Sequence, residues 1–298
     1  MALTFHTLDV FTTRRFGGNP LAVVLDADPL KSAEMQTVAR EFNLSETVFV
    51  LVPEDARHTA RVRIFTPGRE LPFAGHPTVG TAVLLAKLGR IPPSGGDALV
   101  TLEEKIGLIP VQVRNADALA PYAELTAAEL PRAADGVPSD ADLATALGLD
   151  AAEIGFDGHR PGIHSAGISF VYVPVASRDA LSRARFDLGR WRAPAGDVGV
   201  YVYCRGSSAD ADFHSRMFSL GDGIVEDPAT GSAAAIFAGP LHAAAPFPDG
   251  THRRRIAQGE DMGRPSEIAL EVDVVAGALA RVRVGGHAVL VARGEIRI

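Results

Sequence analysis

Charged or polar side chains stand directly before two uncharged stretches of this chain. The segment "EDPATGSAAA" (226–235) places two carboxylates before a proline, a Thr-Gly-Ser turn and a run of small apolar residues. The segment "GHPTVGTAVLLAKLG" places His76 before a stretch that carries no charge until Lys87. A helix start leaves backbone N–H groups unbonded and carries a partial positive charge, so two such ends facing one cleft would bind a carboxylate or phosphate.

Several other chemistries lack their sequence patterns. No Lys follows Gly80 in "GHPTVGT", so the phosphate-binding loop of nucleoside triphosphatases is absent. The chain contains no HExxH motif, no cysteine pair and no acidic calcium loop, so the sequence predicts neither a metal site nor a cofactor. It also lacks the GxSxG turn that exposes a nucleophilic serine in α/β-hydrolases.

Both uncharged stretches have the pattern of helices that are apolar on every face. Pro77 stands where a helix start tolerates proline, and Gly231 and Ser232 open the second stretch, which Gly239-Pro240 should stop or kink after about two turns. A helix that is apolar all round must be covered on all sides. The residues around both stretches form β-branched or aromatic runs bounded by turn residues, such as "LAVVLD", "TVFVLV", "ARVRIFT" and "VGVYVYC". The sequence therefore predicts a central buried helix surrounded by strands in each half.

Other segments predict surface helices and the connection between two domains. Leu30–Phe42 and Ser139–Leu149 are predicted to form surface helices, because their apolar residues recur at helical spacing or follow cap-forming residues. The stretch Asn115–Gly136, rich in Ala, Pro and Asp, is expected to connect two domains. We expect an N-terminal domain at residues 1–118, to which the C-terminal strand 288–298 is added. We expect a C-terminal domain at residues 119–287.

The two halves also share a weak internal repeat. The segments "RVRIFTPGRELPFAGHPTVGTA" and "HSRMFSLGDGIVEDPATGSAAA" both contain Arg-x-Phe, a turn, an acidic residue, a proline and a glycine that opens the buried helix. The match is imperfect, since Phe65 and Gly75 are ten residues apart whereas Phe218 and Gly231 are thirteen apart.

Composition narrows the protein class. A chain of 298 residues with 47% hydrophobic residues can form two domains, each with its own core. The net charge is −7 and the one dense basic run is "HRRR" (252–255), so we expect no nucleic-acid partner. The uncharged stretch 229–248 contains several Gly and Pro residues that disfavour a membrane span. The single cysteine and an N-terminus without a secretory-signal pattern lead us to expect a cytoplasmic protein.

Four motifs in the same order together resemble one known family. The segments "FGGNPLAVV", "NLSETVFV", "RIFTP…ELPFAGHPT" and "EDPATGSA" are similar to those of the PhzF family of phenazine biosynthesis-like isomerases, within the diaminopimelate epimerase-like superfamily. The resemblance extends over nearly the whole chain. It implies an α/β fold of two similar domains, each a barrel-like mixed sheet around a central helix, with the active site in the interdomain cleft and usually a homodimer.

The resemblance also implies roles for individual residues. Glu46 in "NLSETVF" resembles the family's catalytic carboxylate, which takes a proton from a substrate carbon and returns it elsewhere. The resemblance implies that His76 and Asp227 are further catalytic residues in the pocket. It implies that the backbone N–H groups at Gly75 and Gly231 approach the substrate carboxylate, and that Ser232 and Asn19 contact substrate through their side chains. The implied reaction is a cofactor-independent isomerisation of a small substrate that bears a carboxylate.

Structural roles compete with these assignments. Glu46 could be an ordinary polar residue at a strand entrance, and without the resemblance that interpretation would be favoured. Asp227 could cap the helix that follows it, a role that is compatible with substrate contact and is worth about 0.5 to 2 kcal/mol. His76 could have a purely structural role, as a helix cap or a packing residue. A positive helix end, however, keeps an imidazole neutral and suited to hydrogen bonding or proton relay.

The cysteine count separates two chemistries within the superfamily. The racemases that resemble diaminopimelate epimerase use two cysteines, one at each helix start, whereas this chain has one cysteine, Cys204, in "YVYCRG". A small buried hydrophobe is the ordinary explanation for Cys204. Two alternatives to the isomerase remain open: an amino-acid epimerase that uses Glu46 and Asp227 as opposed bases, and a non-catalytic protein that binds small carboxylates.

Overall fold

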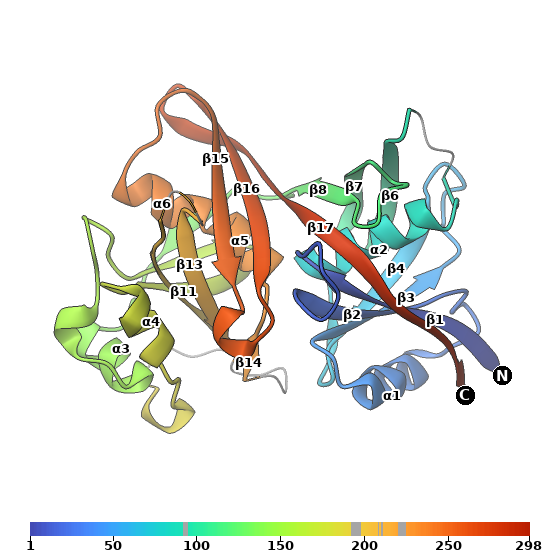
Figure 1. The fold of residues 1–298 in the computed structure, drawn as a ribbon, viewed down its shortest axis with the longest axis horizontal. Helices are drawn as coiled ribbons and strands as arrows, with labels where there is room; N and C mark the ends of the chain where they lie inside the picture. Colours follow the sequence, from blue (N-terminus) through green and yellow to red (C-terminus); the bar gives the residue numbers. More distant parts are fainter. Residues whose placement is uncertain (92–94, 192–197, 208, 210, 220–224) are drawn as a thin grey trace. The chain divides into compact units, whose positions relative to one another are not determined.

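The computed structural model describes residues 1–298 except 92–94, 192–197, 208, 210 and 220–224 (Figure 1). The chain folds into two compact units. Unit 1 comprises Met1–Thr126, Arg264–Glu267 and Val284–Ile298, and unit 2 comprises Ala127–Gly263 and Ile268–Arg283. None of the helices in the described ranges is long and apolar enough to cross a membrane.

The boundary between the units differs in detail from the predicted division. The chain leaves unit 1 after β8 (Tyr122–Thr126), inside the stretch expected to connect the domains, rather than at residue 118. Strand β8 belongs to unit 1 because it pairs with β7 (Gly107–Arg114) in an antiparallel ladder. The long strand β17 (Ala278–Arg297) begins in unit 2 and returns the chain to unit 1.

Unit 1 is an eight-stranded closed barrel. Its pairings run from β1 through β2, β3, β4, β6, β7 and β8 to β17, which pairs with β1 again. The remaining bounds are β1 (Ala2–Val10), β2 (Asn19–Val24), β3 (Glu46–Leu51), β4 (Ala60–Phe65), β5 (Glu70–Leu71) and β6 (Ala98–Glu104). Inside the barrel lies α2 (Gly75–Lys87), which is buried from Gly75 to Ala86 and contacts six of the strands. The predicted central helix is therefore present.

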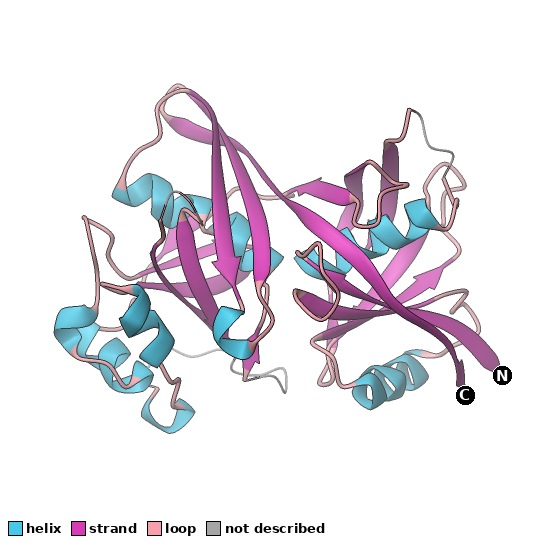
Figure 2. Ribbon diagram, viewed as in Figure 1, coloured by secondary structure: helices cyan, strands magenta, loops and turns pink. Residues whose placement is uncertain are grey.

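Outside this barrel, α1 (Ser32–Phe42) packs on the sheet through Met35, Val38 and Ala39, as its apolar spacing predicts (Figure 2). It begins at Ser32, two positions after the predicted start at Leu30. The helix ends at Asn43, which has a left-handed φ of 50°. Asparagine tolerates this conformation better than most residues, so the chain turns there toward β3.

Unit 2 has a mixed sheet of its own. Strands β9 to β13 pair in order, β11 and β12 run parallel, β13 also pairs with β14 and β15, and the sheet continues through β16 into β17. The strand bounds are β9 (Arg132–Ala134), β10 (Gly162–Ala166), β11 (Ile168–Pro174), β12 (Gly199–Arg205), β13 (Phe213–Phe218), β14 (Glu226–Asp227), β15 (Gly250–Gln258) and β16 (Ser266–Val275). The helices are α3 (Asp140–Leu147), α4 (Arg178–Arg183), α5 (Gly231–Ile236), α6 (Ala238–Ala244) and the short turns η1 (Ala151–Glu153), η2 (Leu188–Arg190) and η3 (Glu260–Met262).

The central helix of unit 2 is interrupted earlier than the sequence predicts. Helix α5 ends at Ile236 and α6 begins at Ala238, so the break falls at Phe237. Gly239 and Pro240 both lie in the first turn of α6, where a proline costs no hydrogen bond. The pair therefore does not end the helix but begins its second part.

The predicted internal repeat is present as matched strand registers. Phe65 pairs with Glu70 between β4 and β5, and Phe218 pairs with Glu226 between β13 and β14. Arg63 and Arg216 each bind the acid of their own hairpin through two hydrogen bonds of 2.7–2.8 Å, and each guanidinium lies 5.0–5.2 Å from the phenylalanine ring centre. The three additional residues of the second copy all fall between Phe218 and Glu226, a connection that includes residues outside the described ranges.

Candidate functional site

Three predicted site residues of unit 1 lie together at the start of α2. Asn19 is the first residue of β2, Glu46 is the first residue of the parallel neighbour β3, and His76 is the second residue of α2. The His76 Nδ1 atom lies 3.1 Å from Asn19 Nδ2 and 3.4 Å from Glu46 Oε2. Strands β2 and β3 and the helix start therefore bring the three side chains into contact, as the proposed roles require.

Burial separates the roles that these three residues can take. Asn19 and His76 are buried, whereas 15% of the Glu46 side chain is exposed. Burial lowers the pKa of His76 to about 3. The imidazole is therefore neutral at physiological pH, with one nitrogen that donates a hydrogen bond and one that accepts. Glu46 is the member of the group that can both ionise and reach a ligand.

The start of α2 also offers backbone donors. Its N-cap residue, Ala74, has no side-chain acceptor, so it cannot bond the first N–H groups of the helix. Gly75, the first helical residue, is buried directly beside His76. This turn can hold a carboxylate through its N–H groups and the positive end of a helix of 13 residues.

The predicted residues of unit 2 lie at the start of α5. Asp227 ends β14 and is buried, and its Oδ2 accepts a hydrogen bond of 2.6 Å from Thr230 Oγ1. Thr230 is the N-cap residue, followed by the buried Gly231 and the partly exposed Ser232. The Asp227 carboxylate is therefore oriented by the residue that begins the helix, and capping and substrate contact remain compatible.

A buried glutamine that no sequence pattern pointed to supports this turn. Gln258, the last residue of β15, donates from Nε2 to the Asp227 carbonyl at 2.8 Å and to Thr230 Oγ1 at 3.1 Å. Its Oε1 accepts from the Thr230 backbone N–H at 3.3 Å. Gln258 lies 31 residues after Asp227, so only the pairing of β13 with β15 reveals the contact. In "PATGS", by contrast, the N-cap position of Thr230 could have been identified from its residue type, although its side chain makes no capping hydrogen bond.

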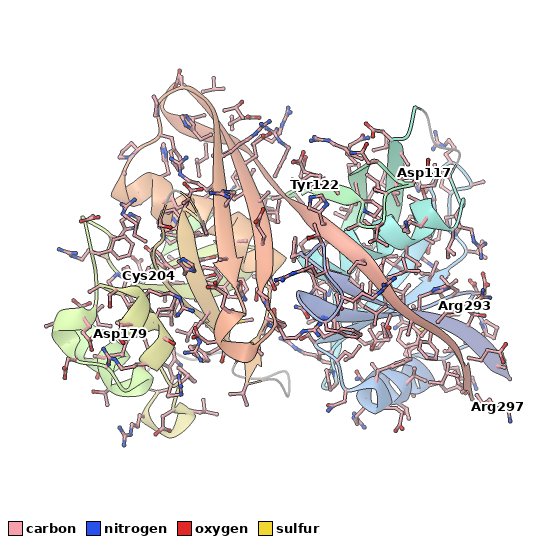
Figure 3. All side chains as sticks on the ribbon, in the orientation of Figure 1. Asp117, Tyr122, Asp179, Cys204, Arg293 and Arg297 are labelled. Carbon is pink, nitrogen blue, oxygen red and sulfur yellow. The ribbon has the colours of Figure 1, made fainter. Side chains whose placement is uncertain are left out.

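Cys204 has no part in either group of residues. It lies on β12 in the hydrophobic core of unit 2 (Figure 3). Burial raises the pKa of its thiol to about 11, so the thiolate is scarce at physiological pH. Among the residues that the structure describes, no group of three or more His, Cys, Asp and Glu side chains could hold a metal ion.

A hollow of about 700 Å³ in unit 1 lies beside β4, β5, β6 and β7. Its lining includes charged side chains that pair with one another, among them Arg63 with Glu70 and His58 with Glu103. None of Asn19, Glu46 and His76 contributes to it. Glu104 does line the hollow, and it also contacts Thr78 in the first turn of α2.

Comparison with known proteins identifies the family. Residues 8–294 match the family model described as phenazine biosynthesis-like protein, PhzC-PhzF. The chain belongs to this family. An uncharacterized isomerase of Mesorhizobium japonicum is 48% identical to it over 298 residues, covering 97% of each chain. A trans-2,3-dihydro-3-hydroxyanthranilate isomerase of Pseudomonas fluorescens is 36% identical, again over 97% of each chain.

Solved structures of the PhzF family share the fold. The crystal structure of a Bacillus anthracis phenazine biosynthesis protein of the PhzF family aligns with a TM-score of 0.87 and 26% identity, covering 100% of both chains. The Mesorhizobium japonicum and Pseudomonas fluorescens relatives are both named isomerases. The resemblance drawn from the four motifs is thus confirmed, and this PhzF-family chain is an isomerase of that type.

Proposed function

We propose that this PhzF-family isomerase moves a proton between two carbons of a small carboxylate-bearing substrate, with Glu46 as the general acid and base. The observation that carries the proposal is the group of Glu46, His76 and Asn19. Within this group, the side chain of Glu46 is partly exposed and contacts the imidazole of His76. That imidazole is buried, and its burial keeps it neutral. A carboxylate in such a place can remove a proton from an activated C–H bond.

The proposed reaction conserves the proton. The Glu46 carboxylate takes a proton from an acidic C–H bond, and the electron pair of that bond spreads over the conjugated system of the substrate. Glu46, now a carboxylic acid, returns the proton to a second carbon of that system. The neutral His76 can donate a hydrogen bond to a substrate oxygen or nitrogen, while Asn19 fixes the orientation of its ring.

The remaining predicted residues are proposed to bind the same substrate. The N–H groups at Gly75 and Gly231 would hold its carboxylate, and Asp227 and Ser232 would orient its other polar groups. The bond from the Thr230 hydroxyl to the Asp227 carboxylate supports this role, and Gln258 holds Thr230 and the Asp227 backbone carbonyl in place. No cofactor is required by this chemistry.

The internal repeat favours one carboxylate base at the strand-start position. Thr47 pairs with Phe65, and Val200 pairs with Phe218, so the residues before them, Glu46 and Gly199, occupy matching places in the two units. Unit 2 therefore has a glycine where unit 1 has the base. This asymmetry suits a proton that leaves and returns through one carboxylate.

The test is NMR of the substrate in D₂O with the wild-type protein. The named substrate of the Pseudomonas fluorescens relative, which carries a ring carboxylate, is the first compound to try, followed by small cyclic and amino-acid carboxylates. We expect a product with a shifted double bond. Because Glu46 is partly exposed, its carboxylic acid can exchange its proton with D₂O before returning it, so deuterium should appear at the newly saturated carbon. Inversion at one carbon without a shifted double bond would instead establish the epimerase, with Glu46 and Asp227 as opposed bases.

A further inference from the structure

Glu104 is a buried carboxyl group that touches the helix bearing His76. It is the last residue of β6, on the face where Ala98, Val100 and Leu102 point into the barrel, and only 8% of it is exposed. Its Oε1 lies 2.6 Å from Oγ1 of Thr78, in the first turn of α2. Its Oε2 is buried with no hydrogen-bond partner among the described residues.

The hydrogen bonds of Thr78 determine which group carries the proton. The Thr78 Oγ1 atom lies 2.6 Å from Glu104 Oε1 and 2.7 Å from the carbonyl oxygen of Ala74. A hydroxyl has one hydrogen, so Thr78 cannot donate to both oxygens, and the Ala74 carbonyl oxygen can only accept. Both contacts are hydrogen bonds only if Glu104 donates to Thr78, which requires a carboxylic acid rather than a carboxylate.

The surroundings of Glu104 favour this neutral form. The inward-facing residues on the neighbouring strands, Val62, Ile64 and Ile109, are aliphatic and buried. On α2, the titratable group of the first turn is His76, which is itself neutral. Nearby charged side chains are paired elsewhere: Arg61 with Glu54, Arg63 and Lys105 with Glu70, and His58 with Glu103. Burial accordingly raises the pKa of Glu104 to about 8.

The internal repeat supplies an independent argument. Ala60 of β4 pairs with Leu102 of β6 in unit 1. The residue of β13 that corresponds to Ala60 in the repeat is Phe213, and it pairs with Ile256 of β15 in unit 2. Leu102 therefore corresponds to Ile256, and two residues further along β6 and β15 Glu104 corresponds to Gln258. Gln258 bonds Thr230, the N-cap residue of its central helix, and the Asp227 carbonyl, through an amide that is neutral at every pH. The two units thus use the same strand position to hold the helix start, and only unit 1 does so with a group that can ionise.

We propose that Glu104 is a positioning residue that acts as a neutral acid: it fixes the first turn of α2, and its ionisation weakens substrate binding at alkaline pH. The effect on substrate rests on the proposed function, whereas the protonation state does not. As a carboxylate, Glu104 can only accept, so Thr78 would bond either Glu104 or Ala74 but not both. A negative charge against this turn would also repel the substrate carboxylate, so KM should change more than kcat.

The protonation state can be tested without substrate by infrared spectroscopy in D₂O. At about pH 6 the wild type should show a carboxylic-acid C=O band that Glu104→Gln lacks and that disappears as the pH rises through about 8. The matched control is Glu41→Gln, which removes an exposed carboxylate of α1 and should leave the band unchanged. A wild type without this band at about pH 6, or a Glu104→Gln variant that keeps it, would overturn the proposal.

The activity arm uses the substrate identified by the NMR test. Between about pH 7 and about pH 9, kcat/KM of the wild type should fall about tenfold, mostly through KM, as expected when one group with a pKa near 8 must stay protonated. Glu104→Gln should keep its activity over this range, since Gln258 shows that an amide can hold a helix start. An unchanged alkaline loss in Glu104→Gln would refute the role of Glu104. A wild type that turns over no tested carboxylate would count against the proposed function while the infrared result still stands.

Discussion

Replacing Glu104 by Gln should remove a specific pH dependence from the stability of the protein. The pKa of Glu104 is about 8 in the folded chain and 4.5 for an unperturbed glutamate. Between these values the unfolded state has released its proton and the folded state has kept it. Because the unfolded state then binds fewer protons, the free energy of unfolding of the wild type falls as the pH rises, and it levels off above about pH 8.

The size of the effect follows from the difference between the two pKa values. One pKa unit corresponds to about 1.4 kcal/mol, so a difference of about 3.5 units amounts to about 5 kcal/mol between about pH 4.5 and about pH 8. The glutamine amide does not ionise, so Glu104→Gln escapes this loss. The free energy of unfolding of the variant minus that of the wild type should therefore grow by about 1.4 kcal/mol per pH unit in this window.

Urea unfolding at a series of pH values measures this difference directly. Subtracting the wild type removes the contributions of groups that titrate equally in both proteins, and Glu41→Gln serves as the control for loss of an exposed carboxylate. That control should differ from the wild type by less than about 0.5 kcal/mol at every pH. A constant difference between Glu104→Gln and the wild type from about pH 4.5 to about pH 8 would refute a neutral buried Glu104.

Three further substitutions test the packing and the hydrogen bonds around the helix starts. Gly80→Ala would place a Cβ 2.6 Å from a Leu21 methyl inside the barrel, so thermal unfolding should show a loss of about 1–3 kcal/mol. Gln258→Ala should cost about 1–3 kcal/mol in urea unfolding, because it leaves buried groups at the start of α5 unsatisfied. Thr230→Val removes the 2.6 Å bond to the Asp227 carboxylate and should lower kcat/KM about 10- to 100-fold, whereas unchanged kinetics would show that this bond does not prepare the site.

Much of the fold could be predicted because its strongest signals are local. The stretch from Gly75 to Lys87 is apolar on every face, and it forms the buried helix α2. Ser139 was identified as a capping residue, and it accepts a hydrogen bond from the Asp142 N–H at the start of α3. The exact place of the break in the central helix of unit 2 was not predicted: it falls at Phe237, before the Gly-Pro pair.

The candidate site was harder to predict from local sequence patterns, because its residues come from distant parts of the chain. Glu46 and His76 are 30 residues apart, and their contact depends on a barrel that closes around α2. Nothing in "NLSETVF" marks Glu46 as special, and only the resemblance to the family singled it out. Glu104 and Gln258 were missed because their roles depend on strand registers, which sequence patterns do not give. The internal repeat noticed in the sequence became informative only when those registers matched the residues one by one.

The central claim is that Glu46 carries the proton. The most direct measurement is the rate of deuterium incorporation into substrate by Glu46→Gln in D₂O, with ligand binding followed by titration calorimetry and Glu41→Gln as the matched control. Glu46→Gln should bind the ligand and incorporate no deuterium, while the control exchanges at the wild-type rate. Deuterium incorporation at the wild-type rate by Glu46→Gln would contradict the account.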